Sequence, residues 1–236
     1  EMCIRDSYTF SNGKMYFSGL EDKYPVKYQK QGSYVGGLFV FESKLTQEFR
    51  LHFDEKIAEM FQSIGIREGS VWIEVFHDGE NYYFNEVGFR YGGSVSIYPV
   101  DYFYQINQVA ADIHYALTGE SCISEHTSLI RSTLPRKKYY CIYPVHINAG
   151  TISSISGLDK IAQLENIVYL ATTKYLHDRI ESSGSFSQVF ALVHFVCNTT
   201  EECIQTIDRI HQMLVVFDEH GNNMVNRMLD VGKIIF

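Results

Sequence analysis

The spacing of apolar residues predicts three amphipathic helices along the chain. The first covers residues 46–64 and is stopped by Gly65, and the second covers roughly residues 100–117. The third starts at Thr199, where Glu202 follows at the three-residue spacing of a capping box. The apolar face of the first helix is expected to consist of Phe49, Phe53, Ile57, Phe61 and Ile64.

Two β-hairpins are predicted where β-prone runs flank a turn signal. Residues 7–17 form the first, around Asn12 and Gly13. Residues 71–76 and 82–87 form the second, around an Asp-Gly turn. In an antiparallel hairpin, residues equally far from the turn lie opposite each other, so this second hairpin fixes which side chains meet.

A further apolar run predicts a strand at residues 33–41, whereas the polar stretch 19–32 is expected to be a loop. The remaining strands are predicted at residues 139–147, 151–155, 167–172, 188–197 and 215–217. Hairpins mixed with single helices are typical of the α+β class.

The polar stretch 120–138, broken by a proline, is the predicted domain boundary. It divides the chain into residues 8–120 and residues 121–236. Residues 1–7 stand apart, because Glu-Met-Cys-Ile-Arg-Asp can be back-translated into a sequence that resembles the transposon end of sequencing-library adapters. We therefore expect residues 1–7 to be an assembly artefact, and the predicted fold starts at Tyr8.

Composition narrows the function classes. The net charge of −8 argues against a nucleic-acid partner, since neutralising a nucleic-acid backbone requires a basic surface, but nucleotide binding needs only a few local cations. No apolar run has the length of a membrane span, so no membrane partner is expected. The five cysteines have no Cys-x-x-Cys spacing, which favours a reduced, cytoplasmic protein with buried thiols over a zinc or disulfide framework.

The second hairpin carries the candidate chemistry. Glu74 and Glu86 lie at similar distances from its turn and can project from one face towards the same point. Two converging carboxylates repel each other unless a cation lies between them. Oxygen ligands of this kind suit Mg²⁺, which takes its other ligands from water and nucleotide phosphates.

Arg90 follows Glu86 by four residues and precedes Gly92 and Gly93. An arginine can neutralise a transferring phosphoryl group, and glycines allow backbone amides to approach it. Together with the two glutamates, these residues indicate a site for phosphoryl transfer. Simpler interpretations stay open: the glutamates as a solvent-facing pair, Arg90 in a surface salt bridge, and the two glycines as an ordinary turn.

The segment from Glu74 to Gly93 resembles the ATP-grasp superfamily, in which a hairpin joins a first acidic residue to a Glu-x-Asn-x-Arg motif and a Gly-rich loop. The resemblance implies that Glu74 and Glu86 are metal ligands and that Arg90 faces the phosphate or the substrate carboxylate. The usual asparagine, a third metal ligand, is Gly88 in this chain. Because this third ligand is missing, it stays open whether the site binds two metal ions.

Three later segments, residues 150–152, 155–159 and 191–202, are similar to the domain that follows the grasp domain in carbamoyl-phosphate-synthase-like and amino-acid-ligase-like members. The resemblance thus covers residues 8–236 and implies an ATP-grasp C-terminal subdomain, an antiparallel sheet with helices, followed by a small α+β domain. The upstream parts of the family, with phosphate-binding lysines, a lid and an adenine hinge, cannot be found before Tyr8. We therefore expect this stretch alone to be inactive.

The function implied by the resemblance is that of an ATP-dependent carboxylate–amine ligase. ATP and Mg²⁺, with Mn²⁺ as the alternative ion, would be the cofactors, and a small carboxylate and an amine the substrates. Two alternatives remain: a carbamoyl-phosphate- or carboxylase-type module acting on bicarbonate, and a non-catalytic scaffold, which Gly88 favours. The oligomeric state is open, with a homo-oligomer among the options.

Overall fold

The computed structural model describes residues 2–93, 95–123 and 138–236. The chain divides into two compact units, and neither is contiguous in sequence. Unit 1 consists of Glu1–Asp22 and Phe41–Arg136, and unit 2 of Lys23–Val40 and Lys137–Phe236. Residues 23–40 therefore group with the C-terminal part of the chain, whereas the sequence suggested one boundary within 120–138. Most of that stretch lies outside the described residues.

Unit 1 begins with the predicted hairpin. Its strands are β1 (Met2–Ser11) and β2 (Lys14–Lys27). Asn12 and Gly13 have φ angles of 52° and 77°, the left-handed pair that a type I′ turn needs, so the Asn-Gly signal is confirmed. Residues 2–7 form part of β1 and pair with β4 (Gly69–His77), so the fold extends beyond its predicted start at Tyr8.

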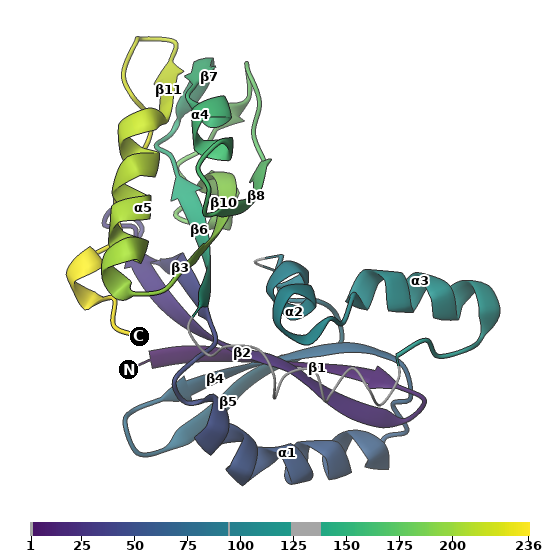
Figure 1. Ribbon diagram of the computed structural model, residues 1–236. Coiled ribbons are helices and arrows are strands. Elements are labelled where there is room, and N and C mark those ends of the chain that lie inside the picture. The colour runs from purple at the N-terminus through teal and green to yellow at the C-terminus, as the bar shows by residue number, and fades with distance from the viewer. Residues whose placement is uncertain (1, 94, 124–137) are drawn as a thin grey trace. The chain divides into compact units, whose positions relative to one another are not determined.

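The sheet of unit 1 has the strand order β5-β4-β1-β2, with β5 spanning Tyr82–Gly88. The helix α1 (Thr46–Ser63) runs along one face of this sheet, and α2 (Ile97–Tyr104) and α3 (Gln108–Thr118) lie on the other side (Figure 1). As the apolar spacing predicted, α1 buries Phe49, Ile57 and Phe61, whereas Phe53 is partly buried and Ile64, beyond the end of α1, is 68% exposed. The buried side chains of α1 join Ile4, Tyr8, Phe10 and Ile73 of the sheet in one core.

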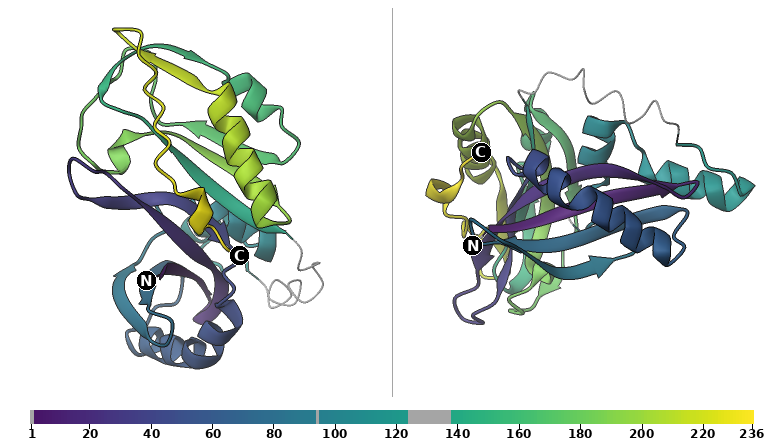
Figure 2. Two further views of the ribbon diagram at one scale, coloured as in Figure 1. Left: turned by 90° about the vertical axis from the view of Figure 1, so that its left-hand side faces the viewer. Right: turned by 90° about the horizontal axis from the view of Figure 1, so that it is seen from below.

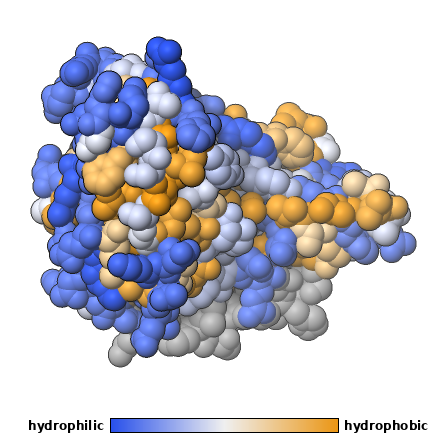
Figure 3. Space-filling view, turned by 90° about the horizontal axis from the view of Figure 1, so that it is seen from above, coloured by the Kyte–Doolittle hydropathy of each residue, from blue (hydrophilic) through white to orange (hydrophobic). Residues whose placement is uncertain are grey.

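The predicted helix over 100–117 is wrong as a single element, because the structure has α2 (Ile97–Tyr104) and α3 (Gln108–Thr118). Gln105 takes a left-handed φ of 54°, which ends α2, and Asn107 caps α3 by accepting a hydrogen bond from Ala110 N. Of the residues of α3, only Gln108 is buried. Its apolar side chains stay on the surface (Figure 3), with Ile113 55% and Leu117 80% exposed.

The loop predicted over 19–32 is also wrong in its first part, since β2 continues to Lys27. Charged residues suggested exposure, yet Glu21 is 2% and Asp22 0% exposed. Arg5 lies 3.8 Å from Glu21, and burial raises the pKa of Asp22, which favours its neutral form. Strand pairing on both sides of β2 thus outweighs the polar character of these residues.

Unit 2 is built on a second run of paired strands, in the order β3-β6-β10-β8. They are β3 (Tyr34–Phe41), β6 (Tyr139–His146), β10 (Val189–Cys197) and β8 (Ile167–Thr172). The helix α5 (Thr200–Met213) lies across them (Figure 2) and buries Cys203, Ile207 and Ile210 in their core. Thr199 accepts a hydrogen bond from Glu202 N, so the predicted cap is confirmed.

A smaller sheet, in the order β11-β7-β9, completes unit 2. Its strands are β7 (Gly150–Ser156), β9 (Arg179–Ile180) and β11 (Val215–Asp218). The short helix α4 (Leu158–Ala162) and the 3₁₀ turns Phe186–Gln188 and Val231–Lys233 were not predicted. Of the helices that the structure describes, none has both the length and the apolar character needed to cross a bilayer.

Candidate functional site

The hairpin of β4 and β5 places Glu74 directly opposite Glu86. Directly opposed residues of an antiparallel pair project from the same face of the sheet, so the two glutamates converge as expected, although counting from the turn alone would pair Glu74 with Asn85. A β-bulge at Asn85 precedes the pair, so Val75 is opposite Phe84. Bulges re-aim side chains, and this one directs the amide of Asn85 to Glu74, with Nδ2 donating to Oε1 at 3.2 Å.

Glu74 is buried and charge-compensated, whereas Glu86 is open to solvent. Glu74 is only 8% exposed, and Nε of Arg5 donates to its Oε2 at 3.2 Å. Arg5 also lies near Glu21 and over the ring of Trp72, at 5.2 Å from the ring centre. The pair thus combines one carboxylate held in place with one that is free to reach a ligand in solution.

Trp72 fills the position next to Gly88. The two residues are paired across β4 and β5, and a Cβ on Gly88 would lie 2.2 Å from Nε1 of Trp72. The indole is 4% exposed, and its Nε1 has no hydrogen-bond partner among the described residues. Any larger side chain at position 88, asparagine included, would collide with this ring, which explains physically why glycine stands there.

Arg90 lies exposed beyond the end of β5 and stacks on the ring of Trp72. Its guanidinium carbon is 4.7 Å from the centre of the Trp72 ring, and Nη1 donates to Tyr91 O at 3.0 Å. Such stacking orients a guanidinium while its remaining N–H groups stay available to an anion. The structure therefore gathers Glu74, Glu86 and Arg90 around Trp72.

Gly92 and Gly93 lead from Arg90 to the N-terminus of α2. A Cβ on Gly92 would lie 2.4 Å from Oγ of Ser96, so the chain approaches the residue before α2 closely. Nothing lies within 4 Å of a Cβ on Gly93. Position 94, between these glycines and α2, is outside the described residues.

The donor set fits a hard divalent cation in charge and ligand type, since Glu74 and Glu86 offer carboxylate oxygens from one face. Arg5 already neutralises Glu74, so a cation bound there would share that carboxylate with the guanidinium or displace it. Sequence reasoning missed Asn85, Trp72 and Arg5. The contact of Asn85 depends on a bulge, and those of Trp72 and Arg5 depend on cross-strand pairing. No local sequence pattern predicts either feature.

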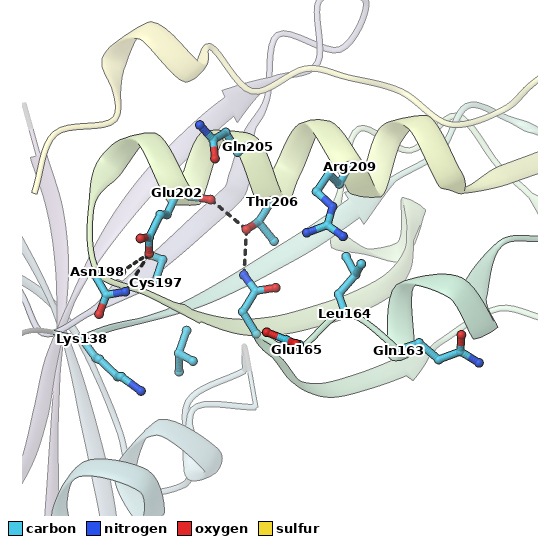
Figure 4. Close-up of a pocket in the computed structure, with 12 residues that line it drawn as sticks. Lys138, Gln163, Leu164, Glu165, Cys197, Asn198, Glu202, Gln205, Thr206 and Arg209 are labelled. Atoms are coloured by element: carbon cyan, nitrogen blue, oxygen red, sulfur yellow. Dashed lines mark hydrogen bonds between the residues drawn. The ribbon is translucent and has the colours of Figure 1, made fainter.

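A pocket of about 550 Å³ lies elsewhere, in unit 2, and contains none of these residues. Figure 4 shows that its wall is formed by α5 and the segment before β8, with hydrogen bonds linking Glu202 to Asn198 and Thr206 to Asn166. On the hairpin of β4 and β5, by contrast, Glu86 and Arg90 are exposed at the surface.

Comparison of the sequence with protein-family models and with curated proteins gives no match. Solved structures do match in fold. L-amino acid ligase from Bacillus licheniformis is 20% identical, with a TM-score of 0.71 over 92% of this chain and 52% of that one. Phosphoribosylglycinamide synthetase from Anaerococcus prevotii is 13% identical, with a TM-score of 0.73 over 92% and 53%.

A third match is the biotin carboxylase domain of 2-oxoglutarate carboxylase from Hydrogenobacter thermophilus, solved with MgADP, ADP and bicarbonate. It is 14% identical, with a TM-score of 0.68 over 91% of this chain and 46% of that one. The fold is that of the ATP-grasp enzymes. The chain spans about half the length of these solved structures, so it represents part of an ATP-grasp fold.

Proposed function

We propose that the protein carrying this chain is an ATP-grasp ligase that activates a carboxylate as an acyl phosphate and couples it to an amine. Glu74 and Glu86 would hold Mg²⁺ against the phosphates of ATP, and the ion would neutralise charge on the transferring phosphoryl group. The observation that carries the proposal is the direct pairing of these two glutamates on one face of the hairpin.

The surrounding residues have roles that their contacts suggest. Asn85 and Arg5 hold the carboxylate of Glu74 in one orientation, so that its lone pairs are fixed before a ligand arrives. Arg90, whose stacking on Trp72 supports this role, would bind an anionic oxygen of the phosphate or the substrate. Arginine at this point would stabilise charge that develops during phosphoryl transfer.

The test is Mg²⁺-dependent ADP formation by the full-length protein, screened with pooled amino acids and small carboxylates. We expect turnover only when both a carboxylate and an amine are present. Glu86→Gln keeps the shape but removes the charge, and is expected to lower turnover by about 10²–10³-fold. Glu80→Gln, in the exposed turn of the same hairpin, is the matched control and should keep wild-type activity. Full activity in Glu86→Gln would remove the metal-site assignment.

A bicarbonate-activating module is the second candidate, favoured by the similarity to a biotin carboxylase domain. It predicts ADP formation with bicarbonate and no added amine. A non-catalytic scaffold is the third, favoured by Gly88, whose position leaves no room for the usual asparagine. Absence of turnover with every pool, together with absence of Mg²⁺-dependent nucleotide binding, would support the scaffold.

A further inference from the structure

Three cysteines far apart in the sequence meet in the core of unit 2. Cys141 lies on β6, Cys197 ends β10, and Cys203 lies in the first turns of α5. The sulfur of Cys141 is 3.7 Å from that of Cys197 and 3.9 Å from that of Cys203, and all three lie within 4.8 Å of one another. All three are buried, with exposures of 0–2%.

The sheet and the helix fix this triangle. The register pairs Cys141 with Phe195 and Cys197 with Tyr139, so the two cysteines are diagonal neighbours on one face of β6 and β10. Cys203 comes from the helix that packs on the same core. The N-cap of α5 at Thr199 stabilises the first turn of the helix, on which Cys203 lies. No large rearrangement is needed to bring the three sulfurs to one point.

Two sides of the triangle have the length found in a three-sulfur metal site, and the third is within 4.8 Å. With metal–sulfur bonds of about 2.3 Å, three ligands in a plane around one ion lie about 4.0 Å apart, and three corners of a tetrahedron about 3.8 Å apart. The measured separations of 3.7 and 3.9 Å are close to both values. Among the residues that the structure describes, no fourth histidine, cysteine or carboxylate joins the group.

Ligand number separates the candidate ions. Structural Zn²⁺ sites are almost always four-coordinate, whereas thiolates are the soft ligands that select Cu⁺. A group of three sulfurs without a fourth protein ligand therefore suits a trigonal soft cation better than zinc. Cys197 also belongs to the lining of the pocket of unit 2 (Figure 4), so the buried cluster lies next to that pocket.

We propose that Cys141, Cys197 and Cys203 form a binding site for one soft monovalent cation, Cu⁺, coordinated by three sulfurs. On binding, three S–H bonds break, three Cu–S bonds form and three protons pass to solvent, with no change of oxidation state. The site is independent of the hairpin glutamates, because it uses other residues in the other unit. Its test therefore leaves the proposed ligase function untouched.

The experiment is an anaerobic titration of the purified 236-residue chain with Cu⁺, in competition with a chromophoric Cu⁺ chelator. We expect one equivalent to bind tightly. Loss of second-sphere partners alone costs 10–100-fold in metal affinity, so loss of a ligand in Cys141→Ser, Cys197→Ser or Cys203→Ser should cost more than about 100-fold. Cys122→Ser, at an exposed position, is the control and should bind as the wild type does.

X-ray absorption of the wild-type complex keeps the proposal testable if a serine variant fails to fold. Three sulfur neighbours at about 2.3 Å, with an unchanged near-ultraviolet circular dichroism spectrum, are expected. Two sulfur neighbours, or loss of the near-ultraviolet spectrum on binding, would show that the ion extracts thiols from an ordinary core and would overturn the site. So would equal affinity in the wild type and all three serine variants, or tighter competition by Zn²⁺.

Discussion

Replacing Gly88 by alanine tests whether the indole of Trp72 really occupies the space beside it. The new methyl carbon would lie 2.2 Å from Nε1, 2.8 Å from Cε2 and 3.0 Å from Cδ1 of the ring. Overpacking of this kind typically costs about 1–3 kcal/mol. The lower entropy of the unfolded alanine chain offsets about 0.4–1 kcal/mol of it. We therefore expect a net loss of about 1–2 kcal/mol in the free energy of unfolding.

The assay is urea unfolding followed by tryptophan fluorescence. Trp72 is the only tryptophan in the chain, so the signal reports on unit 1 at the point of the substitution. With a slope of about 2 kcal/mol per molar urea, the midpoint should fall by roughly 0.5–1 M. Gly93→Ala is the control, because no atom lies within 4 Å of its Cβ position, and its midpoint should not fall.

An unchanged midpoint in Gly88→Ala, or the same change in both variants, would refute the reasoning. A double variant adds a second check. Trp72→Phe removes Nε1, the atom nearest to the new methyl group, and also removes a buried donor without a partner. In that background Gly88→Ala should cost much less, as circular dichroism can measure in the absence of tryptophan.

Three further predictions follow from the contacts of other residues. Arg5→Ala should raise the affinity for Mg²⁺ several-fold in a calorimetric titration, because Glu74 loses the cation at 3.2 Å; equal or weaker binding would contradict this. Burial lowers the pKa of His194 to about 3, so the unfolded chain binds its proton first and unit 2 should lose stability as pH falls below about 6.5. His194→Gln should flatten that dependence by up to about 1.4 kcal/mol per pH unit, whereas His220→Gln, at an exposed position, should not. Thr199→Ala should cost about 1 kcal/mol of stability in urea unfolding and Thr199→Ser much less, since serine keeps the cap; equal losses would argue against capping.

Local signals account for the parts of the fold that the sequence predicted. The Asn12-Gly13 turn, the apolar face of α1 and the cap of α5 each depend on residues a few positions apart. The break between α2 and α3 does not, because it rests on a left-handed Gln105, a conformation for which glutamine has no preference.

The candidate site was predictable to the same extent. Hairpin symmetry brings Glu74 and Glu86 near each other, but counting from the turn pairs Glu74 with Asn85, and only the bulge at Asn85 places Glu86 directly opposite. The ring of Trp72 over Gly88 depends on strand register beyond the bulge, and the sulfur triangle joins Cys141 to residues 56 and 62 positions away. Contacts of this range are set by tertiary pairing, so no spacing rule for metal ligands detects them.

The chain leaves unit 1 within β2 and returns to it at the end of β3, which limits how this protein can be divided or recombined. The two segments of unit 2, residues 23–40 and 137–236, are separated by about 100 residues of unit 1. Closing a loop of that length costs about 4 kcal/mol of chain entropy. An expression fragment that begins at Lys138 would lack β3 and leave the edge of β6 open to other chains. A chimera that exchanges the C-terminal half with a relative would have to carry residues 23–40 along with it, so the inherited module is a pair of segments rather than one length of gene.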